Sequence, residues 1–209
     1  MSSRQPLLLL GLGAIALVVS GVNPHDRATW WLEISPILLA VPVLVATGRR
    51  FRFTPLVYWR IFLHALILML GGHYTYARVP LGLWVQEALH LGRNHYDRLG
   101  HFAQGFVPAL VVREVLLRCT LLRRGGWLFF LVTCVCLATS AFYEFIEWWA
   151  ALLLRQGADA FLGTQGDPWD TQWDMFMAFT GALLAQLLLA GAQDRQLERM
   201  RTPSADAAR

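Results

Sequence analysis

An aspartate and a histidine stand four residues apart in the stretch NHYDRLGHFAQG, which runs from Asn94 to Gly105. If this stretch is helical, the side chains of Asp97 and His101 lie on one face, one turn apart. A long apolar run follows, and ionisable side chains beside such a run are costly to keep unless they are paired or used. The spacing suits a histidine base oriented by a carboxylate, or two ligands of one metal ion.

Three other stretches place ionisable residues in similarly apolar surroundings. His73 stands in GGHYTY, and FYEFIEWW places Glu144 and Glu147 three residues apart, on one helical face. In DPWDTQWDM, Asp170 fits the acidic first turn or N-cap of a helix, whereas Asp174 lies a full turn into the apolar part. Carboxylates in such positions need protons, an arginine or a bound cation as partners.

The composition is that of a membrane protein. Of the 209 residues, 56% are hydrophobic and 15% are charged, whereas about a quarter are charged in a typical soluble domain. The net charge of +4 comes from arginines interspersed between apolar runs. They are typical of topology signals and do not form a nucleic-acid-binding face. The three cysteines form neither a CxxC pair nor a disulfide framework, and we interpret them as buried thiols.

Six apolar runs are long enough to cross a bilayer, which takes about 20 helical residues. The sequence therefore predicts an all-α, polytopic membrane bundle of six transmembrane helices. Residues 1–192 form the single transmembrane domain, and residues 193–209 form a polar cytoplasmic tail that is predicted to be disordered beyond Arg201. The predicted spans cover approximately residues 6–22, 30–47, 56–76, 96–117, 126–154 and 171–192.

The distribution of arginines predicts the orientation, because cytoplasmic loops carry an excess of basic residues. One set of termini and connections carries 12 arginines, and the opposite set carries 5. Both termini are therefore expected in the cytoplasm. The larger set is Arg4, Arg49, Arg50, Arg52, Arg113, Arg118, Arg123, Arg124, Arg195, Arg199, Arg201 and Arg209, and the smaller set is Arg27, Arg78, Arg93, Arg98 and Arg155.

This orientation brings the ionisable residues to one side of the membrane. Glu144 lies 18 residues after Gly126, roughly 27 Å along a helix that rises about 1.5 Å per residue, and therefore near the outer boundary. Four spans thus carry His, Asp or Glu side chains to the outer leaflet, an arrangement that we interpret as a functional site. The candidate catalytic residues are His73, Asp97, His101, Glu144, Glu147 and Asp174.

Imidazole and carboxylate groups are suitable ligands for a divalent metal ion. The sequence carries neither an HExxH motif nor a pair of ExxH motifs, so it indicates neither a zincin nor a ferritin-like centre. Arg98 is an alternative partner for the two glutamates of FYEFIEWW. The candidate metal ligands are His73, Asp97, His101, Glu144 and Asp174.

The blocks HYTY, NHYDRLGHFAQG, YEFIEWW and GTQGDPWDTQWDM resemble the YjdF-type family of bacterial inner-membrane proteins. A more distant similarity is to the VanZ-like proteins, whose shared elements would correspond to Asp97, His101 and Phe102, to Glu144, and to Asp174 and Gly181. Arg98 stands where those proteins usually have lysine, and Ala178 or Phe179 falls near their asparagine. The resemblance implies a multi-pass inner-membrane protein and implies no particular reaction.

Two classes of function remain open at this point. The first is a membrane-embedded enzyme that acts on a lipid or lipid-linked envelope substrate, with His101 or His73 as base and the carboxylates orienting it or binding a cation. The second is a binding, transport or structural protein in which the same residues form a polar network that locks the helices together. An enzyme requires an accessible cavity, whereas a structural network should be dry and fully hydrogen-bonded. Neither class involves nucleic acid, and the oligomeric state is left open.

Overall fold

The apolar stretches form helices in the computed structural model, which describes residues 4–154 and 164–201. No strand occurs in these two segments, so the all-α prediction is confirmed. A short 3₁₀ turn, η1 (Tyr76–Arg78), follows the third helix. The α-helices are α1 (Arg4–Ser20), α2 (Arg27–Thr47), α3 (Pro55–Tyr74), α4 (Pro80–Ala88), α5 (Tyr96–Cys119), α6 (Gly126–Leu154) and α8 (Asp170–Arg201).

Local sequence determines where several of these helices begin. The side chain of Asp26 caps α2 by accepting a hydrogen bond from Thr29 N at 2.7 Å. The same hydrogen bond lowers the pKa of the Asp26 carboxyl group. Proline stands at the first position of α3 and of α4, where its fixed φ suits a helix and its missing N–H leaves no bond unmade.

Four helices, α2, α3, α6 and α8, are long and apolar enough to cross a membrane. Two of the six predicted spans do not meet both conditions. α1 is apolar but has only 17 residues. α5 has 24 residues but carries five charged side chains, and its polar residues are largely buried against other helices.

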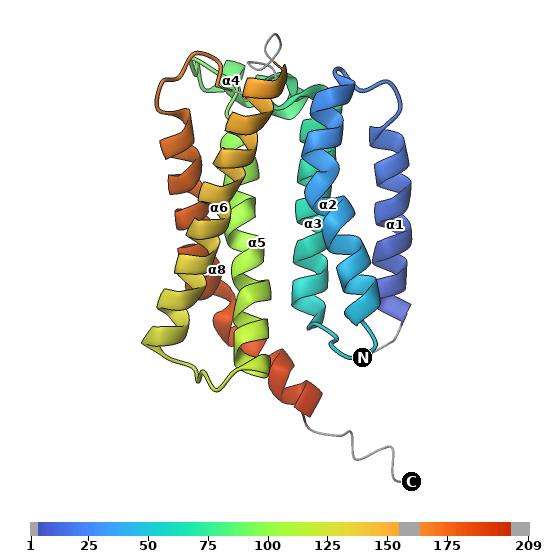
Figure 1. Cartoon of the computed structure of the whole chain (residues 1–209), viewed down its shortest axis with the longest axis vertical. Helices are drawn as coiled ribbons and strands as arrows, with labels where there is room; N and C mark the ends of the chain where they lie inside the picture. The colour runs from blue at the N-terminus through green and yellow to red at the C-terminus, as the bar shows by residue number, and fades with distance from the viewer. Residues whose placement is uncertain (1–3, 155–163, 202–209) are drawn as a thin grey trace.

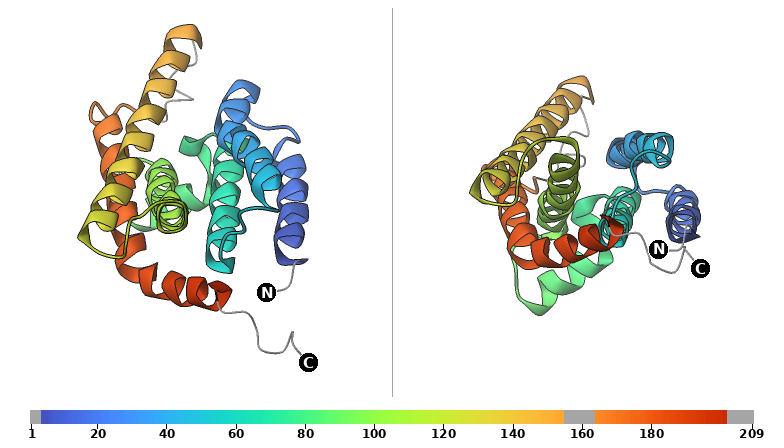
Figure 2. Two further views of the ribbon diagram at one scale, coloured as in Figure 1. Left: turned by 60° about the horizontal axis from the view of Figure 1, so that its bottom comes forward. Right: turned by 90° about the horizontal axis from the view of Figure 1, so that it is seen from below.

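The helices form two groups that meet at α3 and α5. α3 packs against α1 and α2, while α5 packs against α6 and α8. Figure 1 shows the two groups side by side, and Figure 2 shows from below how α5 lies between α3 and the α6–α8 pair. The start of α1 and the end of α8 lie at one end of the bundle, and α4 lies at the other, which we call the α4 end (Figure 1).

α8 extends beyond the predicted end of the transmembrane domain. The helix continues without a break to Arg201, and Gln193, the first residue of the predicted tail, is fully buried. Asp194 forms an ion pair with Arg113 of α5. The first nine residues assigned to the tail therefore belong to the folded bundle, while the predicted disorder beyond Arg201 falls outside the described residues.

Small residues allow α5 and α8 to approach each other closely. A Cβ atom at Gly105 would overlap the carbonyl oxygen of Ala178, and one at Gly181 would overlap the carbonyl oxygen of Phe102. Helices in membranes associate through van der Waals packing of this kind, because lipid chains are as apolar as the helices and provide no hydrophobic driving force. The α5–α8 contact is the most extensive in the bundle.

The variant Gly105→Ala should destabilise the protein by about 1–3 kcal/mol, because the added methyl group forces the two backbones apart. The unfolding temperature of the detergent-solubilised protein measures this effect. Gly11→Ala in α1 is the matched control, since a Cβ there meets no atom within 4 Å. Equal unfolding temperatures for the two variants would contradict the packing described for α5 and α8.

Candidate functional site

His101 lies at the centre of a group of buried carboxylates. Its Nε2 atom lies 3.6 Å from Asp97 Oδ1, 3.9 Å from Glu147 Oε1 and 4.0 Å from Asp174 Oδ2. Its Nδ1 atom lies 3.8 Å from Glu144 Oε1. The exposed fractions of the five residues range from 1% for Asp174 to 8% for Glu147. We call these five residues the carboxylate cluster.

Three helices assemble the cluster at the α4 end of the bundle. The i, i+4 spacing on α5 places Asp97 and His101 on one face, and the i, i+3 spacing on α6 does the same for the two glutamates. Asp174, one turn into α8, reaches His101 because α5 and α8 pack closely. The structure therefore brings together five of the six candidate residues predicted from the sequence.

The orientation of the His101 ring is held by Gln104. His101 Nδ1 lies 2.9 Å from Gln104 Oε1. With this amide oxygen as the acceptor, Nδ1 carries a proton, and in the neutral imidazole Nε2 would then present its lone pair to the carboxylates. Metal-bound histidines are commonly held in this way, with the second ring nitrogen donating to a neighbouring oxygen.

Several carboxylate oxygens of the cluster have no hydrogen-bond partner. They are buried atoms of three different residues, Asp97 Oδ2, Glu144 Oε1 and Asp174 Oδ1. The distances from His101 to the nearest carboxylate oxygens all exceed hydrogen-bonding range. Four carboxyl groups thus surround one imidazole, and such a buried group requires protons or a cation to balance it.

The structure does not bring His73 into the cluster. At the end of α3, its Nδ1 atom lies 2.9 Å from the carbonyl oxygen of Ser20, and its ring packs edge-on against Tyr74. Ser20 ends α1, so His73 belongs to the contact between α1 and α3. The sequence predicts correctly that His73 lies at the end of its helix. The direction in which its side chain points depends on how the helices pack.

Other buried polar residues next to the cluster were not identified from the sequence. Glu33 of α2 is 4% exposed and lines the same cavity as His101, Tyr76 and Tyr143. The ring of Tyr143 stands edge-on to that of His101, with centroids 6.2 Å apart. A lone glutamate inside the second apolar run was the available sequence signal, since a charged residue there must be enclosed.

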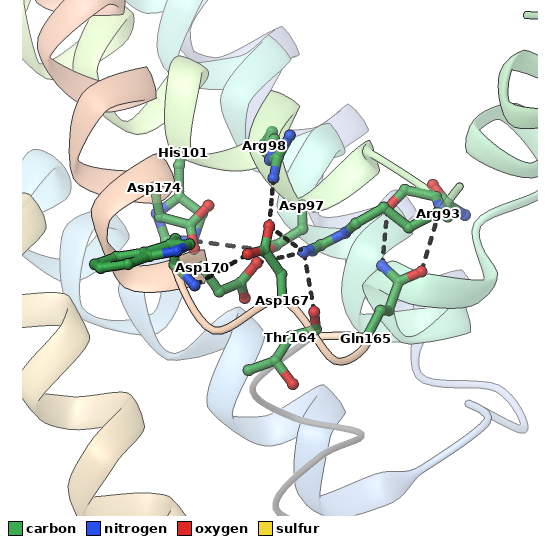
Figure 3. Close-up of polar contacts among 11 residues, drawn as sticks. Arg93, Asp97, Arg98, His101, Thr164, Gln165, Asp167, Asp170 and Asp174 are labelled. Carbon is green, nitrogen blue, oxygen red and sulfur yellow. Dashed lines mark hydrogen bonds and ion pairs between the residues drawn. The ribbon is translucent and has the colours of Figure 1, made fainter. Parts of the chain in front are cut away.

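Ion pairs connect the residues around the start of α8 to the start of α5. Arg93 donates to Asp170 Oδ1 at 2.6 Å, and Arg98 donates to Asp167 Oδ2 at 2.8 Å. Figure 3 shows both arginines converging on these aspartates, with Asp97, His101 and Asp174 beside them. These contacts hold the first turn of α8, and thereby Asp174, against α5.

Asn94 fixes the start of α5. Its side chain is fully buried, and Nδ2 donates to the carbonyl oxygens of Ala77 and Val79 at 3.1 and 3.2 Å. Its Oδ1 accepts from Tyr96 N, and its backbone exchanges two hydrogen bonds with the side chain of Gln165. Asn94 therefore links the segment between α3 and α4, the segment between α4 and α5, and the segment before α8. These hydrogen bonds fix the position of Asp97 along the bundle.

Arg98 forms its ion pair outside the carboxylate cluster. Arg98, an alternative partner for Glu144 and Glu147, pairs with Asp167 and stacks over the ring of Trp173 at 4.9 Å. Burial lowers the pKa of His95, and the charges of Arg98 and Arg93 lower it further, so this imidazole is neutral at pH 7. His95 therefore supplies no positive charge to the cluster.

The opposite end of α5 carries a second buried network with a different character. Glu114, fully buried, accepts hydrogen bonds from Thr54 N, Thr54 Oγ1, Arg118 Nη1 and Gln193 Nε2. Arg113 donates to the side chains of Gln193 and Asp194. Thr54, Arg113, Glu114 and Gln193 have no buried side-chain atom without a partner. We call this group the Glu114 network.

The geometry of the carboxylate cluster suits a metal ion. Ligand atoms of Asp97, His101 and Asp174 lie within 4.8 Å of one another, and so do those of His101, Glu144 and Glu147. One imidazole and several carboxylates form a donor set for a divalent cation of the first transition series. A cation would also occupy the space between the unpaired oxygens and balance their charge.

The helices and the cluster define a multi-pass, all-helical membrane protein that encloses its polar groups within the bundle. A family model described as "Predicted membrane protein (DUF2238)" matches residues 5–195, and the chain belongs to this family. It is 57% identical over 185 residues to the inner membrane protein YjdF of Escherichia coli (strain K12), with 88% of each chain covered. These matches confirm the predicted YjdF-type membership, and no solved structure matches the chain.

Removing one carboxylate should affect the two networks differently. Glu114→Gln should lower the free energy of unfolding by about 2 kcal/mol or more, because it places an amide N–H₂ against groups that already donate. Asp174→Asn, which removes one of four crowded carboxylates, should leave the metal-free protein equally or more stable. Thermal unfolding in detergent with a chelator measures both effects. A large loss of stability in Asp174→Asn would identify the cluster as a structural network.

Proposed function

We propose that this protein is a metal-assisted enzyme of the inner membrane that acts on a lipid or envelope-linked substrate at the outer leaflet. The observation that carries this proposal is the set of unpaired, buried oxygens of Asp97, Glu144 and Asp174 around His101. The Glu114 network demonstrates that this bundle can satisfy a buried carboxylate completely where structure alone requires it. A purely structural role would predict the same at the α4 end.

Some residues of the cluster are assigned to metal binding, and one is assigned to proton transfer. His101 Nε2, Asp97 and Asp174 would hold a divalent cation, and Gln104 would keep the imidazole in the required tautomer. Such a cation would polarise a bound carbonyl oxygen. Glu147 lines the adjacent cavity, whereas Asp174 and Glu144 do not, so Glu147 is the carboxylate positioned to exchange a proton with a substrate.

The location at the outer leaflet rests on six membrane passes with both termini in the cytoplasm. α5 belongs among the spans because its charged residues lie inside the bundle, where α3, α6 and α8 cover them. α1, with 17 residues, lies within the lower range for a transmembrane helix. The arginine distribution supports the orientation, with 12 arginines on the proposed cytoplasmic side.

The purified protein should contain about one divalent metal ion per chain by elemental analysis. The variants His101→Ala and Asp174→Asn should each lose it, because each removes a ligand from the same group. His73→Ala is the matched control and should retain the metal, since His73 contacts Ser20 instead. Free metal at about a hundred times its dissociation constant should raise the free energy of unfolding of the wild type by about 2.7 kcal/mol.

Two outcomes would overturn the metal proposal. One is a metal-free wild-type protein whose unfolding temperature does not respond to Mn²⁺ or Zn²⁺. The other is an equal loss of metal from His73→Ala and His101→Ala. A metal-free protein that is also strongly destabilised by His101→Ala would support the alternative, a polar network that locks the helices together.

Cysteine labelling tests the orientation. In a variant whose three native cysteines are replaced by alanine, Glu87→Cys on α4 and Arg123→Cys after α5 introduce exposed thiols at opposite ends of the bundle. A membrane-impermeant maleimide added to spheroplasts should label only the cysteine at position 87. Labelling of the cysteine at position 123 alone would show the opposite orientation. Labelling at both positions would disprove the six-span arrangement.

A further inference from the structure

A cavity of about 50 Å³ adjoins the carboxylate cluster. A single water needs roughly 10–15 Å³ by this measure, so the cavity has room for a small polar group and not for a whole lipid molecule. One wall consists of cluster residues, Asp97, His101 and Glu147. The facing part of the lining comes from the other group of helices and includes Glu33 of α2 and His64 of α3.

The cavity lies between the two groups of helices, since its lining comes from α2 and α3 on one side and from α5 and α6 on the other. Pro36, Leu68 and Tyr143 line it at interior positions of α2, α3 and α6, and all three are half-buried. Their neighbours Leu39 and Phe142 are 72% and 54% exposed, which places this flank of the bundle against lipid. Because partly exposed residues inside a helix are reached from the side, a ligand can approach the cavity from the hydrocarbon region.

The chemistry of the lining disfavours an anionic ligand. Three acidic residues, Glu33, Asp97 and Glu147, line the cavity, and none of its described lining residues is an arginine. The nearby Arg98 is held by Asp167. Phosphate recognition in proteins generally relies on arginine or lysine, and like charges brought together cost several kcal/mol.

The lining offers uncharged hydrogen-bond donors and acceptors instead of a basic side chain. Tyr76, Tyr143 and Gln104 line the cavity with Glu33, and they carry two hydroxyl groups and one amide group. Each of these groups can hydrogen-bond to a hydroxyl or carbonyl oxygen without a charge on the ligand.

We infer that this cavity binds the polar end of an uncharged amphiphile, one with hydroxyl and ester groups, whose hydrocarbon chain lies against lipid between α2 and α6. The inference rests on the proposed function, since it names the class of substrate that would reach the cluster. Glu33, Tyr76 and Tyr143 are then residues that position this polar end beside Glu147 and the cation site.

The full chain in detergent should bind a monoacylglycerol saturably and at least about tenfold more tightly than the lysophosphatidic acid with the same acyl chain. Native mass spectrometry measures both affinities, with and without Mn²⁺. Leu68→Trp, which fills the cavity, should weaken monoacylglycerol binding by about tenfold or more. Leu63→Trp on the lipid-facing side of the same helix is the matched control and should bind like the wild type.

Tyr143→Phe keeps the ring and removes one hydroxyl group, so it tests the lining even if Leu68→Trp unfolds; it should weaken monoacylglycerol binding. Equal affinities for the two lipids, or unchanged binding in Tyr143→Phe and folded Leu68→Trp, would overturn the inference. Selective binding in a protein that never takes up Mn²⁺ would keep the cavity assignment and reject the metal-assisted function. Metal uptake without lipid selectivity would reject the cavity assignment and keep the metal-assisted function.

Discussion

Charged side chains at both ends of α5 cannot face hydrocarbon, and this constraint determines the arrangement of the surrounding helices. Asp97 lies near one end and Arg113 and Glu114 near the other, and all three are buried. α3, α6 and α8 enclose α5 from different sides. Close approach is essential to this enclosure, and the paired glycines, Gly105 on α5 and Gly181 on α8, make it sterically feasible.

The two polar groups on α5 illustrate two uses of buried charge. In the Glu114 network each carboxylate oxygen meets donors from neighbouring segments, so burial costs little and the helices are held in register. In the carboxylate cluster, by contrast, four acidic groups share one imidazole and several oxygens remain unpaired. A protein retains such an unfavourable arrangement when binding or reaction with another species restores the balance.

The separation of the helices into two groups leaves a cavity beside the cluster. Because α2 packs on α3 and α6 packs on α5 and α8, the seam between the groups is bridged mainly by α3 and α5. The cavity lies in this seam, with Glu33 contributed by one group and His101 by the other. Membership of the DUF2238 family shows the kind of membrane protein, while any activity must be argued from the site itself.

The sequence by itself determined the helical class, the positions of the long helices within a few residues except for the end of α8, and the level at which Asp97, His101, Glu144, Glu147 and Asp174 lie. Hydrophobic run length and helical periodicity are local properties, so they can be read without knowledge of the packing. Only the tertiary structure decided which face each helix turns inward. That choice directed His73 toward Ser20, brought Glu33 beside the cluster, and engaged Arg98 with Asp167. Contacts between helices distant in sequence depend on the rotation of each helix about its axis, and the packing of small residues such as Gly105 fixes that rotation.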